Sequence, residues 1–397
     1  MKKLLLLTMA ASLLGFAGCK KAEPEAAPEA PKAEAKAEAK VEVEAKAYDC
    51  APVTVESLVA LSKDDKAVSE DEMYQILEAY QCCEVKDDLS IDGKCPAKQA
   101  EAELKKAKKS IPRTKNLGER LAQHPSNVVR GYLASNYKAY MGGKPDDVKQ
   151  AMKMFGDETD PFVIKSLLYN LSNDGSIPEV GQFMLAQSKS DNAVVRYQAA
   201  TALANPYSKD VAGVVDRCIE LLADPEEKIA NRMCSDIGRL GDDKVVAPIV
   251  KILSDSSKTK IHGNCVNGLA WLWLDYPSHA NTSEAAYKAT LDYLKTTPRT
   301  ESVPASGALQ VLVSVNKDKI DDWKTRATYY KASELVAVLV DIVKDSNADW
   351  RARASAMKAI AAHGTKADLT ALQDVIANDK DSKLLTKPLE DALKEAK

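Results

Sequence analysis

A repeated helical pattern between residues 120 and 380 constrains the fold of this chain more than any other feature. Apolar residues recur at relative positions 0, 4, 5 and 8, the spacing that puts side chains on one face of a helix. The pattern starts at Val129, Val163, Val195, Ile229 and Ile261, which lie 34, 32, 34 and 32 residues apart, with looser copies from Pro304 and Ala352. Because one such unit cannot bury its apolar face alone, the copies are expected to stack.

A second apolar segment and an acidic turn follow each copy. These segments run over 211–222, 245–253 and 335–343, and they end at Asp224-Pro225, Asp255 and Asp345. Asp is a favoured N-cap and Pro suits a first helical turn, so each Asp is expected to cap the next helix. The larger gaps between the last copies predict insertions around 275–299 and 316–332.

The best copies, 191–203 and 224–255, resemble HEAT repeats. The first contains Asp, Val-Arg, Ala-Ala and Ala-Leu in order, and the second contains Gly-Asp followed by an apolar helix. The resemblance implies an all-α, HEAT-like α-helical solenoid over 119–397, with the Val-Arg helices on the concave face. The last apolar positions, in 384–393, predict a closing amphipathic helix. The motif is specific for fold and almost silent on function.

The same resemblance implies a ladder of Asp and Arg side chains that links neighbouring repeats. Arg130, Arg196 and Arg353 hold the Arg position, whereas Ala230 and His262 do not. The ladder is therefore expected to be interrupted in the middle of the solenoid.

Four cysteines outside the repeat, Cys50, Cys82, Cys83 and Cys95, form an even local set. They show no C-x-x-C spacing and no nearby His, which argues against metal binding and redox chemistry. In an oxidising compartment such a set predicts two disulfides that pin a small helical segment over 48–118. Pairing of the neighbours Cys82 and Cys83 would be strained, so each is expected to pair with one of the other two.

Cys218, Cys234 and Cys265 fall at apolar positions of amphipathic segments. Small apolar side chains are the usual occupants of such positions, so these cysteines are expected to be buried packing residues.

The N-terminus predicts export. Residues 1–18 contain two lysines and then an apolar run of about thirteen residues, which is too short to span a bilayer and is typical of a signal peptide. Small residues directly before Cys19 resemble the bacterial lipobox, although Phe16 departs from the usual Leu or Val. The resemblance implies lipidation of Cys19, and Lys20 after it favours the outer membrane. The alternative is an ordinary secretory signal with Cys19 incidental.

Residues 19–47 are almost entirely Ala, Glu, Lys and Pro, so they cannot form a core and are expected to be a tether. The whole chain carries a net charge of −3, which argues against nucleic-acid binding. No nucleophile elbow, phosphate loop or zinc-binding His spacing occurs. The sequence therefore predicts a non-enzymatic lipoprotein scaffold at the periplasmic face of the outer membrane, without metal or cofactor.

Polar side chains at exposed template positions suggest where a protein or peptide partner would bind. The candidates are Tyr197, Arg232, Asn264, Asn267 and Trp271. An exposed Trp is a frequent binding anchor, but Trp271 and Trp273 are more readily explained as aromatics that bury the insertion after them. The alternative function is a HEAT-like lyase or cofactor-handling protein with a pocket near His262, Cys265 and Asp236.

Overall fold

The computed structural model describes residues 48–274, 283–300, 302–313 and 327–396, and the side chains within these ranges except 302–306 and 311. The predicted signal peptide, Cys19 and the tether lie outside the described residues. In the described ranges the regular structure is helical, with two isolated β-bridges. No helix there is long and apolar enough to cross a membrane.

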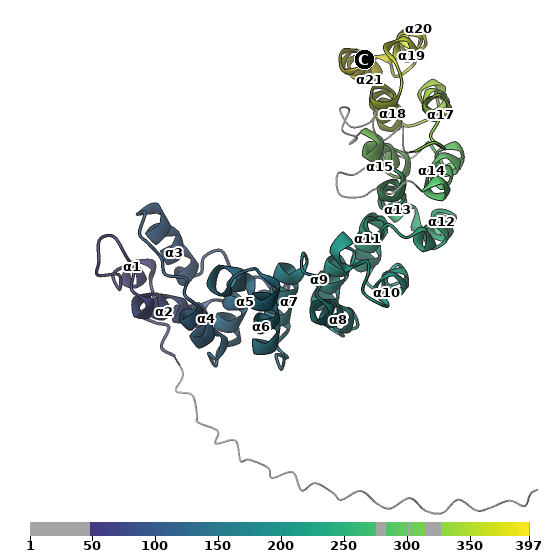
Figure 1. The fold of residues 1–397 in the computed structure, drawn as a ribbon. Coiled ribbons are helices and arrows are strands. Elements are labelled where there is room, and N and C mark those ends of the chain that lie inside the picture. The colour runs from purple at the N-terminus through teal and green to yellow at the C-terminus, as the bar shows by residue number, and fades with distance from the viewer. Residues whose placement is uncertain (1–47, 275–282, 301, 314–326, 397) are drawn as a thin grey trace, which may run out of the picture. The chain divides into compact units, whose positions relative to one another are not determined.

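Two rows of helices build the repeat region (Figure 1). The A row consists of α5 (Asn127–Met141), α7 (Pro161–Leu171), α9 (Ala193–Leu203), α11 (Glu227–Asp236), α13 (Thr259–Trp273), α15 (Ser302–Val313) and α18 (Trp350–His363). The B row consists of α6 (Pro145–Met154), α8 (Pro178–Gln187), α10 (Val214–Leu221), α12 (Val246–Leu253), α14 (Glu284–Thr296) and α17 (Ala332–Lys344). Every A helix packs on the next A helix, which confirms the predicted all-α, HEAT-like solenoid.

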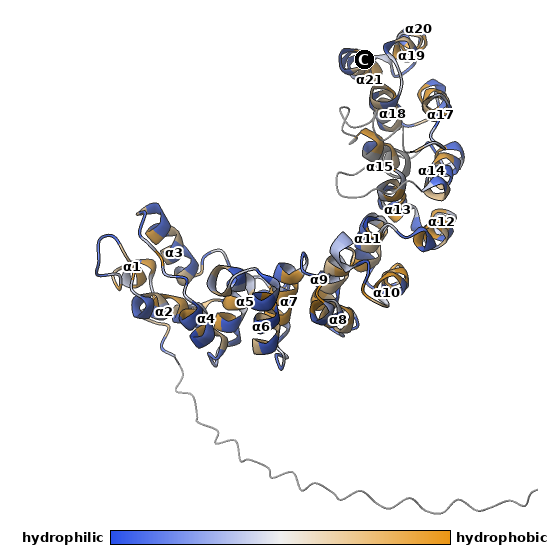
Figure 2. Ribbon diagram, in the orientation of Figure 1, coloured by the Kyte–Doolittle hydropathy of each residue, from blue (hydrophilic) through white to orange (hydrophobic). Residues whose placement is uncertain are grey.

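The apolar template positions form the core between the two rows. In α9, for example, Val195, Ala199 and Leu203 are at most 1% exposed. Figure 2 shows the same division along the rows, with apolar faces turned toward neighbouring helices and hydrophilic faces outward. Burial of these faces by stacking stabilises helices that are too short to be stable alone.

Side-chain caps start several A helices, but the prediction about the acidic turns was only partly right. Asp160 accepts hydrogen bonds from Phe162 N and Val163 N at the start of α7. Asp224 accepts a hydrogen bond from Glu226 N and pairs with Arg196 of the preceding repeat, but the N-cap residue of α11 is Glu226. Asp345 likewise accepts from Asn347 N, whereas Asp349 caps α18. Asp255 caps a short 3-10 turn, η5 (Ser256–Lys258), that precedes α13.

The predicted insertion over 275–299 is in large part a regular element. Helix α14 occupies most of it and packs on α12, α13 and α17 as the B helix of its repeat. The period lengthens there because residues 275–282, which are not described, separate α13 from α14. Residues 316–326 of the second predicted insertion, 316–332, also lie outside the described residues.

The N-terminal segment contains α1 (Val55–Val59), α2 (Glu70–Glu78), η1 (Ala79–Cys82), α3 (Pro96–Lys106) and α4 (Lys115–Ala122). Two disulfides, Cys50–Cys82 and Cys83–Cys95, connect its parts, as expected for a disulfide-pinned segment. Helix α4 and η1 pack on α5, so the segment covers the free side of the first repeat.

The prediction for the other cysteines was wrong for two of them. Cys234 of α11 and Cys265 of α13 are buried, but they form a third disulfide between neighbouring A helices. Cys218 is a buried free thiol, as predicted for a packing residue. Burial raises its pKa to about 12, which keeps the thiol protonated and unreactive.

Three helices close the C-terminal end: α19 (Lys366–Thr370), α20 (Gln373–Ala377) and α21 (Ser382–Glu395). Helix α21 packs on α18 through Leu385 and Leu389, which are at most 6% exposed. The predicted closing amphipathic helix is therefore present, although Leu384 faces solvent.

Candidate protein-binding face

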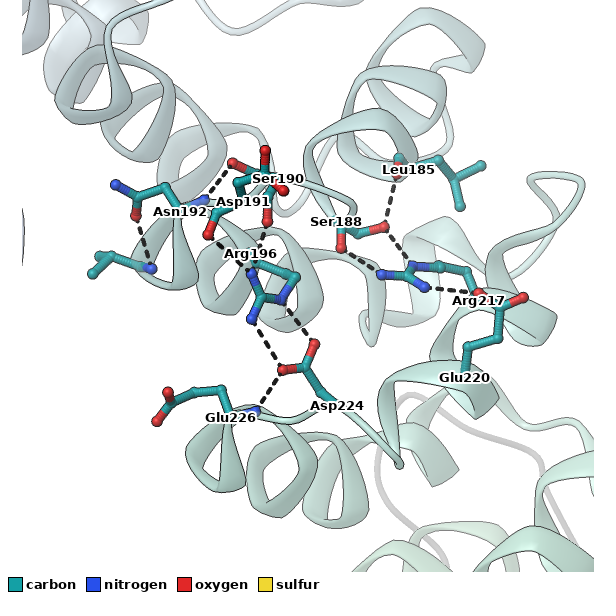
Figure 3. A network of polar contacts seen from close by, with 11 residues as sticks. Leu185, Ser188, Ser190, Asp191, Asn192, Arg196, Arg217, Glu220, Asp224 and Glu226 are labelled. Atoms are coloured by element: carbon teal, nitrogen blue, oxygen red, sulfur yellow. Dashed lines mark hydrogen bonds and ion pairs between the residues drawn. The ribbon is translucent and has the colours of Figure 1, made fainter.

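The surface of the A-row helices, called the A face below, contains every partner-binding candidate proposed from the sequence. Its residues are positioned by the ladder at the ends of the A helices. Arg196 of α9 donates from Nε and Nη2 to the two carboxylate oxygens of Asp224, at 2.8 and 3.2 Å, and from Nη1 to the carbonyl of Ser190 (Figure 3). Arg196 thereby connects the start of its own helix, α9, to the turn before α11.

The same arrangement recurs at both ends of the solenoid. Arg130 donates to Glu158 at 2.7 Å, and Arg353 donates to Asp379 at 2.6 Å. In each case the acceptor lies in the turn after the B helix or in the corresponding C-terminal turn. The implied ladder therefore exists at these three positions, with Glu158 in place of an Asp in the first.

His262 supplies a different contact where the ladder lacks its Arg. The ring is 3% exposed, with Nε2 3.1 Å from the carbonyl oxygen of Asp255 and Nδ1 3.2 Å from the hydroxyl of Tyr293. It reaches the backbone of the preceding turn, as Arg196 does. His262 is thus a structural residue, and its contacts leave it inside the repeat rather than in an open pocket.

The lyase alternative loses its remaining groups in the same way. Cys265 is in the disulfide with Cys234 and offers no thiol. Burial raises the pKa of Asp236, and Arg232 opposes this shift by an ion pair at 2.7 Å. His262, Cys265 and Asp236 line neither the cavity of about 430 Å³ nor the one of about 520 Å³.

Three of the partner-binding candidates make contacts along the A face. Asn264 of α13 donates to Asn231 Oδ1 at 2.6 Å, and Asn267 donates to Ser235 Oγ at 2.8 Å. These hydrogen bonds connect α13 to α11. Arg232 is tied to Asp236 within α11. The structure therefore brings these residues together, but it uses them to join two A helices.

The two tryptophans of α13 differ in environment. Trp273 is fully buried, and its Nε1 donates to Thr290 Oγ1 at 3.0 Å. Trp271 is half-buried on the A face, with the Arg239 guanidinium 4.8 Å from its ring centroid. The packing explanation holds fully for Trp273 and only in part for Trp271.

Tyr197 lies in a more open part of the A face. It is half-buried, and Lys228 Nζ lies 4.9 Å from its ring centroid. Together with Val194, Gln198 and Ile229 it lines a cavity of about 430 Å³ over α9 and α11, to which Lys165 of α7 and Asp88 also contribute. None of the other four candidates lines this cavity.

Sequence reasoning missed Tyr169 of α7. Its side chain is 69% exposed, the largest value among the exposed large hydrophobic residues of the described chain. Tyr169 holds the template position of Thr201, Ser235 and Asn267, so helical periodicity places it on the A face. The sequence alone could have identified Tyr169, because a comparison of this template position between repeats shows one aromatic residue among polar ones.

A second cavity, of about 520 Å³, was also missed. On its wall the buried carboxylate of Glu101 accepts hydrogen bonds from the hydroxyls of Tyr80 and Tyr132, at 2.8 and 2.9 Å. Burial and the neighbouring Glu101 raise the pKa of both hydroxyls, so they remain protonated donors. No spacing in the sequence brings α3 and α5 together, so no motif marked these residues.

Comparison with known proteins assigns the chain to no family. No protein-family model and no curated protein matches the chain. Among solved structures, karyopherin Kap121p bound to the extreme C-terminus of the protein phosphatase Cdc14p is 15% identical with a TM-score of 0.41, and Kap121p bound to Pho4p is 15% identical with a TM-score of 0.44. Each match covers 85% of this chain and 35% of the karyopherin, so the chain spans about a third of that protein's length.

Human deoxyhypusine hydroxylase in complex with glycerol is also similar, at 15% identity and a TM-score of 0.27. This match covers 71% of this chain and 95% of the hydroxylase. At such identities and scores, neither the karyopherin nor the hydroxylase determines what this chain binds or whether it catalyses a reaction.

Proposed function

We propose that the protein is a non-enzymatic scaffold that binds a protein or peptide partner through its A face, held at the cell envelope by a lipid on Cys19. The anchor rests on the sequence pattern of residues 1–19, and the lysine after Cys19 favours the outer membrane. The proposal of a binding scaffold is supported by the exposed side chains of the A face. Solenoids commonly use the continuous surface made by one row of helices to bind extended partners.

Exposure of Tyr169 is the observation that carries the binding proposal. Tyrosine is enriched at interface hot spots, because its ring buries a large area while its hydroxyl still forms hydrogen bonds. On the next A helix, Tyr197 and Gln198 line the cavity of about 430 Å³, which Lys165 of α7 also lines. The two aromatic positions therefore lie on adjacent A helices, as an elongated binding surface requires.

A matched pair of tyrosines tests the proposal. Tyr169→Ala removes the exposed ring on the A face, whereas Tyr207→Ala removes a ring that is 55% exposed in the η2 turn (Pro206–Ser208) between α9 and α10. Both changes should leave thermal stability nearly unchanged, because both rings face solvent. We expect only Tyr169→Ala to weaken partner binding, by about tenfold or more.

The partner for this assay comes from site-specific photocrosslinking in living cells. A photoreactive residue at Gln198 reports on the A face, and one at Val250 of the B-row helix α12, which is 37% exposed, is the control. The proposal predicts one defined adduct at position 198 that is absent at position 250. Equal crosslinking at both positions, or unchanged affinity of Tyr169→Ala, would contradict binding through the A face.

A further inference from the structure

The cavity of about 520 Å³ lies where the N-terminal segment meets the first two A helices. Helix α3 contributes Lys98, Glu101 and Lys105, and α5 and α7 contribute the opposite side. Glu101 is 6% exposed, whereas Lys98 and Lys105 are exposed. The carboxylate therefore lies at the buried end of the cavity and the two lysines lie at its solvent-exposed opening. Its volume is in the range of ligand sites, roughly 300–1,000 Å³.

A disulfide-closed loop, residues 84–94, forms one wall of this cavity. The Cys83–Cys95 bridge joins its ends, and Lys86 N donates to the Ser90 carbonyl at 2.9 Å. At its tip Leu89 has a φ of 54°, a left-handed conformation that is costly for a residue with a side chain. Lys165 of α7 donates from Nζ to the Leu89 carbonyl at 2.8 Å and holds that tip against the A face. The wall is therefore fixed before any ligand arrives.

The charge of the lining is positive. Lys98, Lys105 and Lys165 line the cavity together with one carboxylate, Glu101, and no other acidic residue. Both oxygens of that carboxylate already accept hydrogen bonds from buried tyrosines. Lys165 donates to the Leu89 carbonyl and faces the neighbouring Asp88 carboxylate, so the positive charge available to a ligand is chiefly that of Lys98 and Lys105.

The remaining surface of the cavity is partly apolar. Leu89 and Ile91 contribute side chains from the loop, and Phe162 contributes a buried ring from α7. A ligand that satisfies both halves of the lining must combine an apolar body with a negative group. Inorganic anions lack the apolar body, and neutral hydrocarbons lack the negative group.

We propose that this cavity binds a small organic anion, with its apolar body against Leu89, Ile91 and Phe162 and its acidic group at the lysines. Tyr169 and Tyr197 do not line this cavity, although Lys165 lines both it and the cavity beside Tyr197. Burial lowers the pKa of Lys165, the nearby Asp88 carboxylate opposes that shift, and a bound anion would oppose it further by stabilising the ammonium. The Cys83–Cys95 bridge then acts as a positioning element, because it shapes the wall that contacts the ligand.

A pair of dyes that differ by one charged group provides the test. The anion 8-anilinonaphthalene-1-sulfonate should bind the full chain at one saturable site, measured by its fluorescence. N-phenyl-1-naphthylamine, which lacks the sulfonate, should bind at least about tenfold more weakly. Lys98→Glu/Lys105→Glu should weaken binding of the anionic dye by about tenfold or more, and added salt should weaken it in the wild type.

Two further variants separate the site from non-specific dye binding. Lys106→Glu reverses the charge of one lysine on the same helix, half the charge change of the double variant, but Lys106 does not line the cavity, so the affinity should stay within about twofold. Ala102→Phe places a ring in the lining without changing charge and should abolish binding. Equal loss in Lys106→Glu and Lys98→Glu/Lys105→Glu, or full affinity in Ala102→Phe, would overturn the proposal.

Competition identifies the source of the acidic group. Displacement of the dye by octanoate indicates a free organic acid. Displacement by acetyl-Ala-Ala-Phe with a free carboxylate, but not by its amide, indicates the C-terminus of a polypeptide. Failure of both competitors at millimolar concentration would refute an organic-anion site. None of these outcomes depends on partner binding at Tyr169.

Discussion

Replacing Arg353 by Met tests whether the ladder stabilises the C-terminal end of the solenoid. Arg353 is fully buried in α18. Its guanidinium donates to both oxygens of Asp379, at 2.9 and 2.6 Å, and its Nε donates to the Val343 carbonyl at 2.8 Å. Methionine keeps most of the apolar stem but removes all three hydrogen bonds, so the change isolates the charged head group.

The expected decrease in the free energy of unfolding is large because the Asp379 carboxylate remains buried in the variant. The Asp379 side chain is only 6% exposed, and without Arg353 it becomes a buried carboxylate with no cation at its oxygens. Removing one member of a buried ion pair costs about 3–5 kcal/mol, far more than removing a surface ion pair. Arg351→Met on the same helix is the matched control, since the Arg351 side chain is 58% exposed and should cost under about 0.5 kcal/mol.

The decrease in the free energy of unfolding caused by Arg353→Met should depend on pH. The hydrogen bonds from Arg353 hold the pKa of Asp379 below its usual value, so the pair stabilises the fold when the carboxylate is ionised. That contribution is complete above the unfolded-state pKa of about 3.9 and is lost as pH falls through the folded-state value. The difference between wild type and Arg353→Met should therefore be larger at pH 7 than at pH 3.

Urea unfolding gives the free-energy difference, and amide hydrogen exchange locates it. Because repeats are stabilised mainly by their neighbours, exchange should accelerate in α18 to α21 more than in α5 to α9. The double variant Arg353→Met/Asp379→Asn should lose less than the two single variants added together. A loss below about 1 kcal/mol, or one that does not change with pH, would refute this account of the ladder.

Three other predictions follow from the sequence and the structure. Cys19→Ser should abolish palmitate labelling and release the protein into the soluble periplasmic fraction; an unlabelled, soluble wild type would end the lipoprotein proposal. Mass spectrometry of unreduced peptides should recover Cys50–Cys82, Cys83–Cys95 and Cys234–Cys265, and recovery of free Cys234 and Cys265 from envelope protein would exclude the third bridge. Trp271→Ala should weaken partner binding less than Tyr169→Ala and destabilise the fold less than Trp273→Ala, whose fully buried ring predicts a loss of ~3–5 kcal/mol; equal destabilisation would assign Trp271 to the core.

Helical periodicity made the fold of the repeat region predictable. Residues such as Val195, Ala199 and Leu203 are apolar because they face the core, and the same positions are apolar in the next repeats. Local rules of capping were less reliable. Asp224 both accepts a hydrogen bond from Glu226 N in the turn before α11 and pairs with Arg196, and capping rules cover only local hydrogen bonds, because the ion pair depends on contact between two repeats.

Contacts between distant segments explain what the sequence did not reveal. Cys234 and Cys265 occupy ordinary apolar template positions, so nothing local distinguishes a bonded cysteine from a packing one. The cavity beside Glu101 requires α3 to lie against α5 and α7, and no spacing in the chain encodes that contact. Tyr169 differs from both, because its exposure follows from the repeat register alone.

The interrupted ladder bears directly on where a partner binds. An Arg is missing at Ala230 and His262, and the sequence left two explanations: other contacts join the repeats there, or a ligand occupies the space. The structure supports the first explanation. The Cys234–Cys265 disulfide joins α11 to α13, and the backbones lie so close that a Cβ on Gly268 would come within 2.2 Å of the Cys234 carbonyl oxygen.

Hydrogen bonds of Asn264 and Asn267 add to the same interface between α11 and α13. A surface that holds its own repeats together by a disulfide, close backbone contact and side-chain hydrogen bonds has few groups left for a partner. By contrast, Tyr169 is exposed and Tyr197 lines a cavity on the preceding A helices. The A face of α7 and α9 is therefore the stronger candidate for partner binding, and Trp271 is at most its far edge.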